Sequence, residues 1–231
     1  VPLVRNWLRH VLRDAERCFS DGLKLSEDTR AIAGRPVEFL PSTRRITLVR
    51  EVPARDKPPY RLLFLGRWHP NKGIDLLLDA LAMMVDEDWA RIESVTIHGG
   101  GPMEALVRER VSALAAAARP VRLGGYLDKP AAEQAISEAD WLLIPSRIES
   151  IPVVFSDAMK LGCPVIAMPV GDLSALVQAS EGHVAPRVTT EAFTQALRCA
   201  LSGRAGAHGP AILRMASRFE LQSVAREVGR G

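Results

Sequence analysis

The chain has 231 residues, of which 47% are hydrophobic and 25% are charged. This balance is ordinary for a globular chain, and it excludes a disordered chain, a collagen-like repeat and a low-complexity scaffold. The formal net charge of +3 suits an anionic small molecule. Nucleic acid is not an expected partner, because no concentrated basic patch with interleaved aromatic residues occurs. The length allows one large domain or one and a half.

The three cysteines are odd in number and widely spaced, at positions 18, 163 and 199. Without a Cys-x-x-Cys pair or a Cys/His cluster, they argue against a disulfide framework and against a zinc site. No apolar run approaches the roughly 18 residues that a membrane-spanning helix needs. We therefore expect a cytoplasmic protein.

Residues 1–17 are predicted to form an amphipathic helix, because Trp7, Leu8, Val11 and Leu12 recur at helical spacing. Arginines four residues apart form a basic row on another face of this helix. The row consists of Arg5, Arg9, Arg13 and Arg17. A basic amphipathic helix can lie on the inner face of an anionic membrane. The alternative is a helix docked on a domain core, with the arginines solvated.

Residues 21–59 are predicted to be a connector, because prolines and charges punctuate this stretch, with a short strand near residues 37–40. From Tyr60 onward, short apolar runs alternate with amphipathic segments. Strands are expected at 61–65, 94–98, 121–123, 141–144, 165–168 and 183–185. Helices are expected at 74–84, 103–118, 131–138, 153–161, 173–177, 191–202 and 210–227. This alternation predicts an α/β fold with a Rossmann-like parallel sheet and helices on both faces.

Such sheets bind ligands at the carboxyl ends of their strands. The first strand is followed by the segment GRWHPNKG, residues 66–73. Its glycines allow a tight turn, and the helix start beside it offers free amides that suit phosphate. Arg67 and Lys72 could neutralise a diphosphate from two sides. A loop with solvated charges explains the same residues. The glycines at 99–101 would allow close approach of the backbone at a strand end, but a plain turn is an equally good interpretation.

Two carboxylates follow the fourth strand of this pattern. Glu149 lies in the loop before a helix that Pro152 is suited to begin, and Asp157 lies inside that helix. The two carboxylates could accept hydrogen bonds from sugar hydroxyls, while free amides near Ile151 and Val153 point toward the same crevice. The alternative gives Glu149 a favourable position beside the helix dipole and leaves Asp157 exposed on the helix.

Together, these segments resemble the nucleotide-binding domain of a GT-B glycosyltransferase of the retaining group 1, or family-four, type. The matching segments, in order, are FLGRWHPNKGIDLLLDAL, VTIHGGGP, VRLGGYL, AISEADWLLIPSRIESIPVVFSDAMKLGCPVIA and the Gly-Asp turn at 171–172. The resemblance implies the C-terminal half of a GT-B fold. It also implies a retaining glycosyltransferase that moves a sugar from a nucleotide-diphosphate sugar to an acceptor.

The resemblance further implies roles for the site residues. Arg67 and Lys72 would hold the donor diphosphate, and Glu149 would contact the donor sugar; these three form the predicted catalytic set. Asp157 would contact the ribose, although the family prefers Glu there, and prefers Gly in place of Ser150. The remaining predicted donor-binding residues are Gly66, Gly99, Tyr126, Ser150, Ile151, Pro152 and Val153. Members of this type usually need no bound metal, so we expect neither a metal nor a cofactor besides the donor substrate.

The resemblance also divides the chain. We expect residues 1–20 to belong to an N-terminal acceptor domain outside this chain, residues 60–203 to bind the nucleotide sugar, and residues 204–231 to form a helical tail. The acceptor is left open as a glycan, a lipid or a small molecule. Two alternatives stay open as well: a nucleotide-sugar-binding module without turnover, and a nucleotide-sugar epimerase with the same fold.

Overall fold

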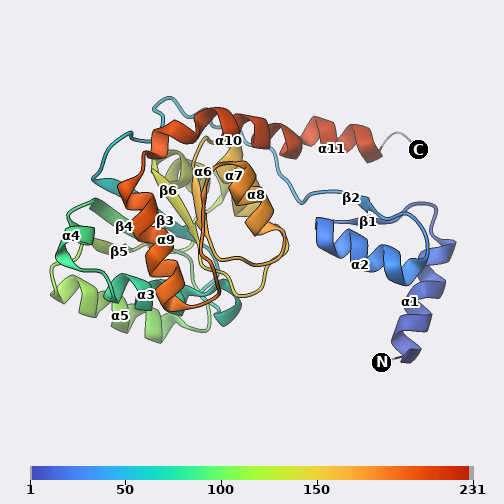
Figure 1. Cartoon of the computed structure of the whole chain (residues 1–231), viewed down its shortest axis with the longest axis horizontal. Helices are drawn as coiled ribbons and strands as arrows, with labels where there is room; N and C mark the ends of the chain where they lie inside the picture. Colours follow the sequence, from blue (N-terminus) through green and yellow to red (C-terminus); the bar gives the residue numbers. More distant parts are fainter. Residues whose placement is uncertain (1, 229–231) are drawn as a thin grey trace.

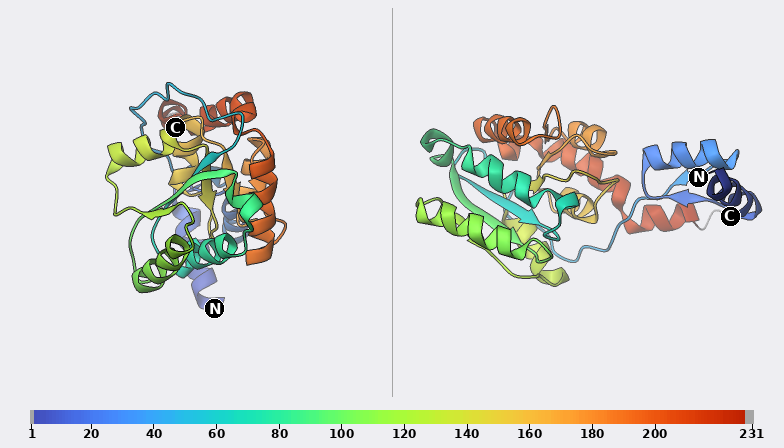
Figure 2. Two further views of the ribbon diagram at one scale, coloured as in Figure 1. Left: turned by 90° about the vertical axis from the view of Figure 1, so that its left-hand side faces the viewer. Right: turned by 90° about the horizontal axis from the view of Figure 1, so that it is seen from below.

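The computed structural model describes residues 2–228, with the backbone alone for residues 2–5, 223 and 226–228. Its two sheets define an N-terminal unit, residues 2–39, and a larger Rossmann-like unit, residues 60–228 (Figure 1). The segment between them, residues 40–59, is the connector. The N-terminal unit lies to one side of the Rossmann-like unit, and α11 (Leu221–Val228) extends toward it (Figures 1 and 2).

The N-terminal unit is a short β-α-β arrangement preceded by a helix. Its elements are α1 (Pro2–Asp14), β1 (Phe19–Ser20), α2 (Leu23–Ala33) and β2 (Glu38–Phe39), and the two strands pair in parallel. Arg35 closes the unit by donating hydrogen bonds to the carbonyls of Leu12 and Glu16, at 3.1 and 2.8 Å, around the end of α1. Helix carbonyls there lack partners inside the helix, and a cation also suits the negative end of the helix dipole.

Helix α2 corrects the prediction of a connector over residues 21–59. Only the part after residue 39 runs without a helix or strand until Tyr60. Its apolar residues lie at its two ends, and residues 26–30 between them are all polar, so hydrophobic periodicity did not reveal it. The available signal was Gly34, which ends α2 in the left-handed conformation with a φ of 67°.

Helix α1 ends at Asp14, so the predicted arginine row extends beyond the helix, and it is partly used inside the N-terminal unit. Arg9 donates a hydrogen bond to the carbonyl of Ile32 at 3.0 Å, and Arg17 forms an ion pair with Glu38 at 2.6 Å. The side chain of Arg5 lies outside the described residues. Contact with a membrane therefore stays a prediction. Within the part of the chain that the structure describes, no helix is both long and apolar enough to span a bilayer.

The Rossmann-like unit is built on a six-stranded parallel sheet with the strand order β5-β4-β3-β6-β7-β8. The strands are β3 (Tyr60–Leu65), β4 (Ile92–His98), β5 (Val121–Leu123), β6 (Trp141–Ile144), β7 (Val165–Ala167) and β8 (His183–Val184). Helices α3 (Ile74–Ala82), α5 (Glu104–Ala116) and α9 (Thr190–Ser202) pack together on one face (Figure 1). Helices α6 (Lys129–Glu138), α7 (Val153–Lys160), α8 (Leu173–Ala179) and α10 (Gly209–Ala216) cover the other. The predicted Rossmann-like fold is confirmed.

Two local differences from the predicted elements have physical causes. A short helix, α4 (Asp86–Trp89), precedes β4 and buries Trp89. The helix predicted over residues 210–227 is interrupted by a 3-10 turn at Ser217–Phe219 and an extended Glu220. The interruption turns Phe219 into the core, where its ring meets that of Phe155 edge to face at 5.8 Å.

Buried carboxylates attach the connector to the Rossmann-like unit. Glu133 on α6 accepts hydrogen bonds from the backbone amides of Thr47 and Leu48, both at 3.1 Å, and from the Thr47 hydroxyl. Burial acts to raise the pKa of Glu133, but the ion pair with Lys129 and the bonds from the connector lower that pKa to about 2. Asp140, just before β6, accepts from the backbone amide of Arg55 in the same way. The connector thus runs along the α6–α7 face and ends at β3.

Candidate functional site

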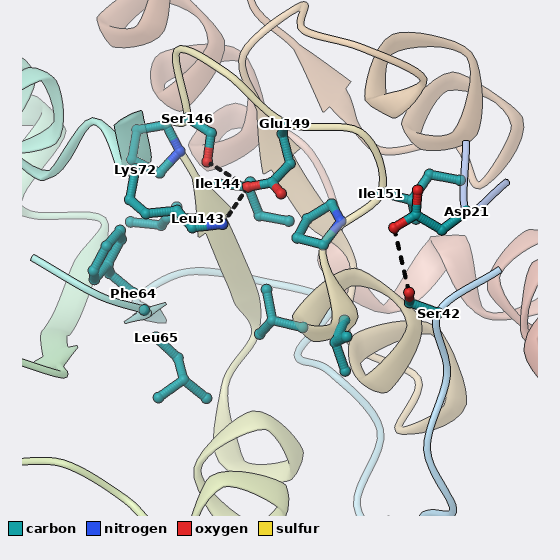
Figure 3. Close-up of a pocket in the computed structure, with 15 residues that line it drawn as sticks. Asp21, Ser42, Phe64, Leu65, Lys72, Leu143, Ile144, Ser146, Glu149 and Ile151 are labelled. Atoms are coloured by element: carbon teal, nitrogen blue, oxygen red, sulfur yellow. Dashed lines mark hydrogen bonds and ion pairs between the residues drawn. The ribbon is translucent and has the colours of Figure 1, made fainter. Parts of the chain in front are cut away.

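The strand order of the Rossmann-like unit reverses at β3 and β6, which are neighbours although two strands separate them in the chain. Open α/β sheets bind ligands outside the carboxyl ends of the strands at such a reversal. A cavity of about 410 Å³ lies there (Figure 3). Its walls are Asp21, Ser42, Phe64, Leu65, Gly66, Lys72, Leu143, Ile144, Pro145, Ser146, Glu149, Ile151, Pro152, Val153 and Val154.

The central polar feature of the cavity is an ion pair between two of the predicted catalytic residues. Lys72, at the end of the 3-10 turn Pro70–Lys72 after β3, contacts the carboxylate of Glu149 in the loop between β6 and α7 (Figure 3). The side chains are 35% and 14% exposed. The Ser146 hydroxyl donates a weak hydrogen bond to the same carboxylate oxygen, at 3.4 Å. One ammonium and one carboxylate are therefore held together where a ligand would enter.

Two glycines allow the loops around this ion pair to approach closely. Gly73 has a φ of +66°, and a Cβ there would lie 1.9 Å from the carbonyl oxygen of Pro145. Gly171 has a φ of +52°, and a Cβ there would lie 2.0 Å from the carbonyl oxygen of Glu149. Any other residue would combine a strained left-handed backbone with a collision against main-chain atoms. Both glycines thus help to set the position of the loop that carries Glu149.

Arg147 joins the two loops and was not predicted to be a site residue. Its guanidinium binds both carboxylate oxygens of Asp75 at 2.7 Å, and it also donates to the carbonyl of Pro70 at 2.8 Å. The hydrogen bond to Asp75 is the main reason that the pKa of Arg147 is raised. The paired residues are 72 positions apart, so spacing along the chain carried no signal of this contact.

The structure brings together most, but not all, of the predicted site residues. Gly66, Ile151, Pro152 and Val153 line the cavity with Lys72 and Glu149. Arg67 is exposed and lies outside that lining, so the structure does not bring both cations to the cavity.

Four predicted donor-binding residues, Gly99, Tyr126, Ser150 and Asp157, also lie outside the lining of the cavity. Tyr126 is 89% exposed. Gly99 packs beside Gly66, where a Cβ would lie 1.9 Å from the Gly66 carbonyl oxygen. The hydroxyl of Ser150 points at Gly22 of the N-terminal unit, 2.2 Å from where a Cβ on that glycine would lie.

Asp157 is buried rather than exposed on its helix. Its side chain has no exposed surface, and Arg44 of the connector donates to its Oδ2 at 2.8 Å. Burial raises the pKa of this carboxyl group, and Arg44 opposes the shift. Among the described residues, Oδ1 has no hydrogen-bond partner. The contact with a ribose stays a prediction, and it requires Arg44 to share or release this carboxylate.

Two cavity residues from outside the Rossmann-like unit were missed. Asp21 of the N-terminal unit and Ser42 of the connector line the side opposite Lys72, and their side chains lie 3.5 Å apart (Figure 3). Nothing in the local sequence places them there, because the fold alone brings the N-terminal unit to the cavity. In the part of the chain that the structure describes, no group of three or more His, Cys, Asp or Glu side chains could hold a metal. The expectation that no metal is needed stays a prediction.

Comparison with known protein families shows which family the chain belongs to. Residues 59–203, which include both loops of the ion pair, match the model of the family Glycosyl transferases group 1. The chain belongs to this family. A D-inositol 3-phosphate glycosyltransferase from Jonesia denitrificans is 33% identical over 150 residues, which cover 61% of this chain and 34% of the relative. A glycogen synthase from Rhodopseudomonas palustris is 34% identical over 170 residues, covering 71% of this chain and 33% of the relative.

Solved structures of glycosyltransferases share the fold of this group 1 chain. Sucrose-phosphate synthase from Thermosynechococcus elongatus has a TM-score of 0.76 at 20% identity, covering 100% of this chain and 61% of that protein. The Anabaena protein HepE, in complex with UDP and glucose, has a TM-score of 0.75 at 17% identity, covering 99% of this chain and 68% of HepE. These are GT-B proteins, so the chain has the fold of the C-terminal part of a GT-B glycosyltransferase. It spans about a third of the length of the curated relatives it matches.

Proposed function

We propose that the chain supplies the donor-binding part of a retaining glycosyltransferase that uses a nucleotide-diphosphate sugar. The observation that carries this proposal is the ion pair of Lys72 and Glu149 at the strand-order reversal, in a group 1 chain. An ammonium there suits the diphosphate, and a carboxylate suits sugar hydroxyls. The acceptor side would come from an N-terminal domain that continues the N-terminal unit, which fits the greater length of the relatives.

The chemistry proposed for these residues is electrostatic. When the bond between the sugar and the diphosphate breaks, negative charge develops on the leaving oxygen. Lys72 would stabilise that charge, and the first amides of α7, at Val153 and Val154, have no partner inside their own helix and could donate to a phosphate or sugar oxygen. Glu149 would orient the sugar. In the proposed front-face substitution, the donor phosphate itself takes the proton of the acceptor hydroxyl, and the new bond forms on the face that the diphosphate leaves.

The comparisons support a uridine nucleotide as the first donor to test. HepE is described in complex with UDP and glucose, while the matched relatives are named for transfer to inositol phosphate and for glycogen synthesis. We propose a hexose donor on this basis and leave the acceptor as a glycan, lipid or small molecule.

Calorimetry of this chain with UDP, GDP, ADP and UDP-glucose tests the donor. The proposal expects saturable binding of at least one diphosphate and loss of affinity in Lys72→Met. Turnover is then measured on the intact protein, and nuclear magnetic resonance of the product shows whether the anomeric configuration is retained. An inverted product contradicts the retaining mechanism. Failure of every diphosphate and of UDP-glucose to bind contradicts donor binding itself.

A nucleotide-sugar-binding module without turnover is the second candidate. Two departures from the family pattern favour it, because Asp157 stands where the family prefers Glu and Ser150 stands where it prefers Gly. Tight donor binding by the intact protein, with neither transfer nor donor hydrolysis, would establish this second function in place of the first.

A further inference from the structure

Asp172 occupies an unusual position between the two units of the molecule. It lies at the end of the loop after β7, immediately before α8, where an aspartate commonly caps its own helix. Within the described residues, its side chain makes no capping hydrogen bond to α8. Its carboxylate instead accepts hydrogen bonds from the backbone amides of Leu23 at 2.7 Å and Lys24 at 3.1 Å. These are the first two residues of α2, in the N-terminal unit.

Helix α2 depends on this carboxylate for its N-terminal cap. The residue that precedes the helix is Gly22, which has no side chain to offer to the free amides. The carboxylate of Asp172 satisfies two of these amides and places a negative charge at the positive end of the helix dipole. Asp172 is only 9% exposed, so water competes weakly for the contact. Residues 149 positions apart thus share one capping arrangement.

The same contact lies next to both polar walls of the cavity. On the Rossmann-like side, Gly171 presses against the carbonyl of Glu149, whose side chain holds Lys72. On the other side, Asp21 lines the cavity and is separated from α2 by Gly22 alone. Asp21 and Glu149 both line this cavity (Figure 3), so we expect a change in the contact between Asp172 and α2 to shift Asp21 relative to Glu149.

We propose that Asp172 is a positioning residue that latches the N-terminal unit onto the Rossmann-like unit and so fixes Asp21 opposite Lys72 and Glu149. The proposal rests on the proposed function in one respect, namely that a nucleotide sugar occupies the cavity. A ligand that touches both walls then binds best when the latch is closed. Loss of a helix cap of this kind corresponds to roughly a 2- to 30-fold change in an equilibrium.

The chain offers a matched control for this latch. Asp128 caps α6 through a hydrogen bond from the amide of Ala131 at 3.0 Å, entirely within the Rossmann-like unit. Asp172→Ala and Asp128→Ala therefore remove the same chemical group from a helix N-terminus, but only the first removes it from the contact between units. Asp172→Asn keeps an acceptor oxygen and serves as the conservative variant. It takes the place of Asp172→Ala in the test if Asp172→Ala does not fold.

The first measurement is hydrogen exchange of the peptide that contains the amides of Leu23 and Lys24. We expect about 2- to 30-fold faster exchange in Asp172→Ala, a smaller increase in Asp172→Asn, and wild-type exchange in Asp128→Ala. The second is calorimetric affinity for UDP-glucose, which we expect to fall several-fold in Asp172→Ala and to stay unchanged in Asp128→Ala, even when both variants lose similar thermal stability.

Two results would overturn the latch. One is unchanged exchange of the α2 amides in both Asp172 variants. The other is a loss of UDP-glucose affinity that is equal in Asp172→Ala and Asp128→Ala, since that would indicate a general effect on stability. If the wild-type chain binds neither UDP nor UDP-glucose, the proposed function fails, and hydrogen exchange still decides whether Asp172 holds α2.

Discussion

The ion pair between Lys72 and Glu149 makes an unusual prediction: replacing the carboxylate should strengthen binding of a nucleoside diphosphate. In the structure, the Lys72 ammonium already contacts Glu149. A diphosphate must displace that carboxylate and also approach its negative charge. Glu149→Gln removes both obstacles while keeping the size and an acceptor oxygen of the side chain. UDP should therefore bind more tightly to this variant than to the wild-type chain.

The expected magnitude follows from the exposure of the pair. A hydrogen bond to a charged group contributes roughly 1.5–3 kcal/mol when protected, and an exposed ion pair contributes about 0–1 kcal/mol. With the two side chains 35% and 14% exposed, solvent screening places the pair near the lower of these ranges. We take about 1 kcal/mol, which corresponds to roughly fivefold tighter binding of UDP.

The assay is titration calorimetry with UDP and with UDP-glucose on four proteins. Lys72→Met should weaken UDP by about tenfold or more, because it removes the cation itself. Ser146→Ala should leave UDP affinity unchanged, since its hydrogen bond to Glu149 is long, at 3.4 Å. For Glu149→Gln, the advantage should be smaller with UDP-glucose than with UDP, because the proposed sugar contact is weakened. If Glu149→Gln weakens UDP as Lys72→Met does, the carboxylate is a support for the loop and the competition argument is wrong.

Three predictions concern stability. Glu133→Gln should make the free energy of unfolding depend less on pH in acid. Because the pKa of Glu133 is lowered in the folded protein, this carboxylate stabilises the fold fully above about pH 4.5, and this contribution, roughly 3 kcal/mol, is lost toward pH 2. The same acid dependence in the variant and the wild type, measured by chemical unfolding, would contradict this. Burial lowers the pKa of His183 and His208 below 6.5 in the folded protein, so the free energy of unfolding should fall as the pH drops below about 6.5. Replacing both histidines by Gln should remove the difference that urea unfolding measures between pH 7.5 and pH 5.5. Arg147→Met should lower the melting temperature and the affinity for UDP, because the loops after β3 and β6 lose the contacts that join them. Arg108→Met, which breaks an exposed ion pair within one helix, should change neither. Equal effects of the two changes would refute this role of Arg147.

The alternation of short apolar runs with amphipathic segments was sufficient for the six strands of the Rossmann-like unit, but not for α4 or for the break at Ser217–Phe219. The central strands β3, β6 and β7 are mostly apolar because both faces of the sheet are covered there, and each strand is followed within two residues by a glycine or a proline. Lys72 and Glu149 were predictable as site residues because each lies in the loop that follows a strand, and parallel strands bring their carboxyl ends to one edge of the sheet. Helix α2 escaped prediction because its apolar residues lie at its two ends, separated by the polar run 26–30, and so do not recur at helical spacing.

The remaining features of the site are contacts between residues that lie far apart in the sequence. Asp157 has the spacing of a ligand-binding acid, yet Arg44 folds back across 113 positions and buries it. Three further contacts likewise join segments whose local sequences do not predict the contact: Arg147 with Asp75, Asp21 with the cavity, and Asp172 with α2. The sequence by itself determined the sheet and the residues at the ends of its strands, because these follow from local periodicity. Only the tertiary structure decided which charges are paired, which are buried and which contacts join the N-terminal unit to the Rossmann-like unit. The physical reason is that the role of a charged side chain depends on the groups that the completed fold places beside it.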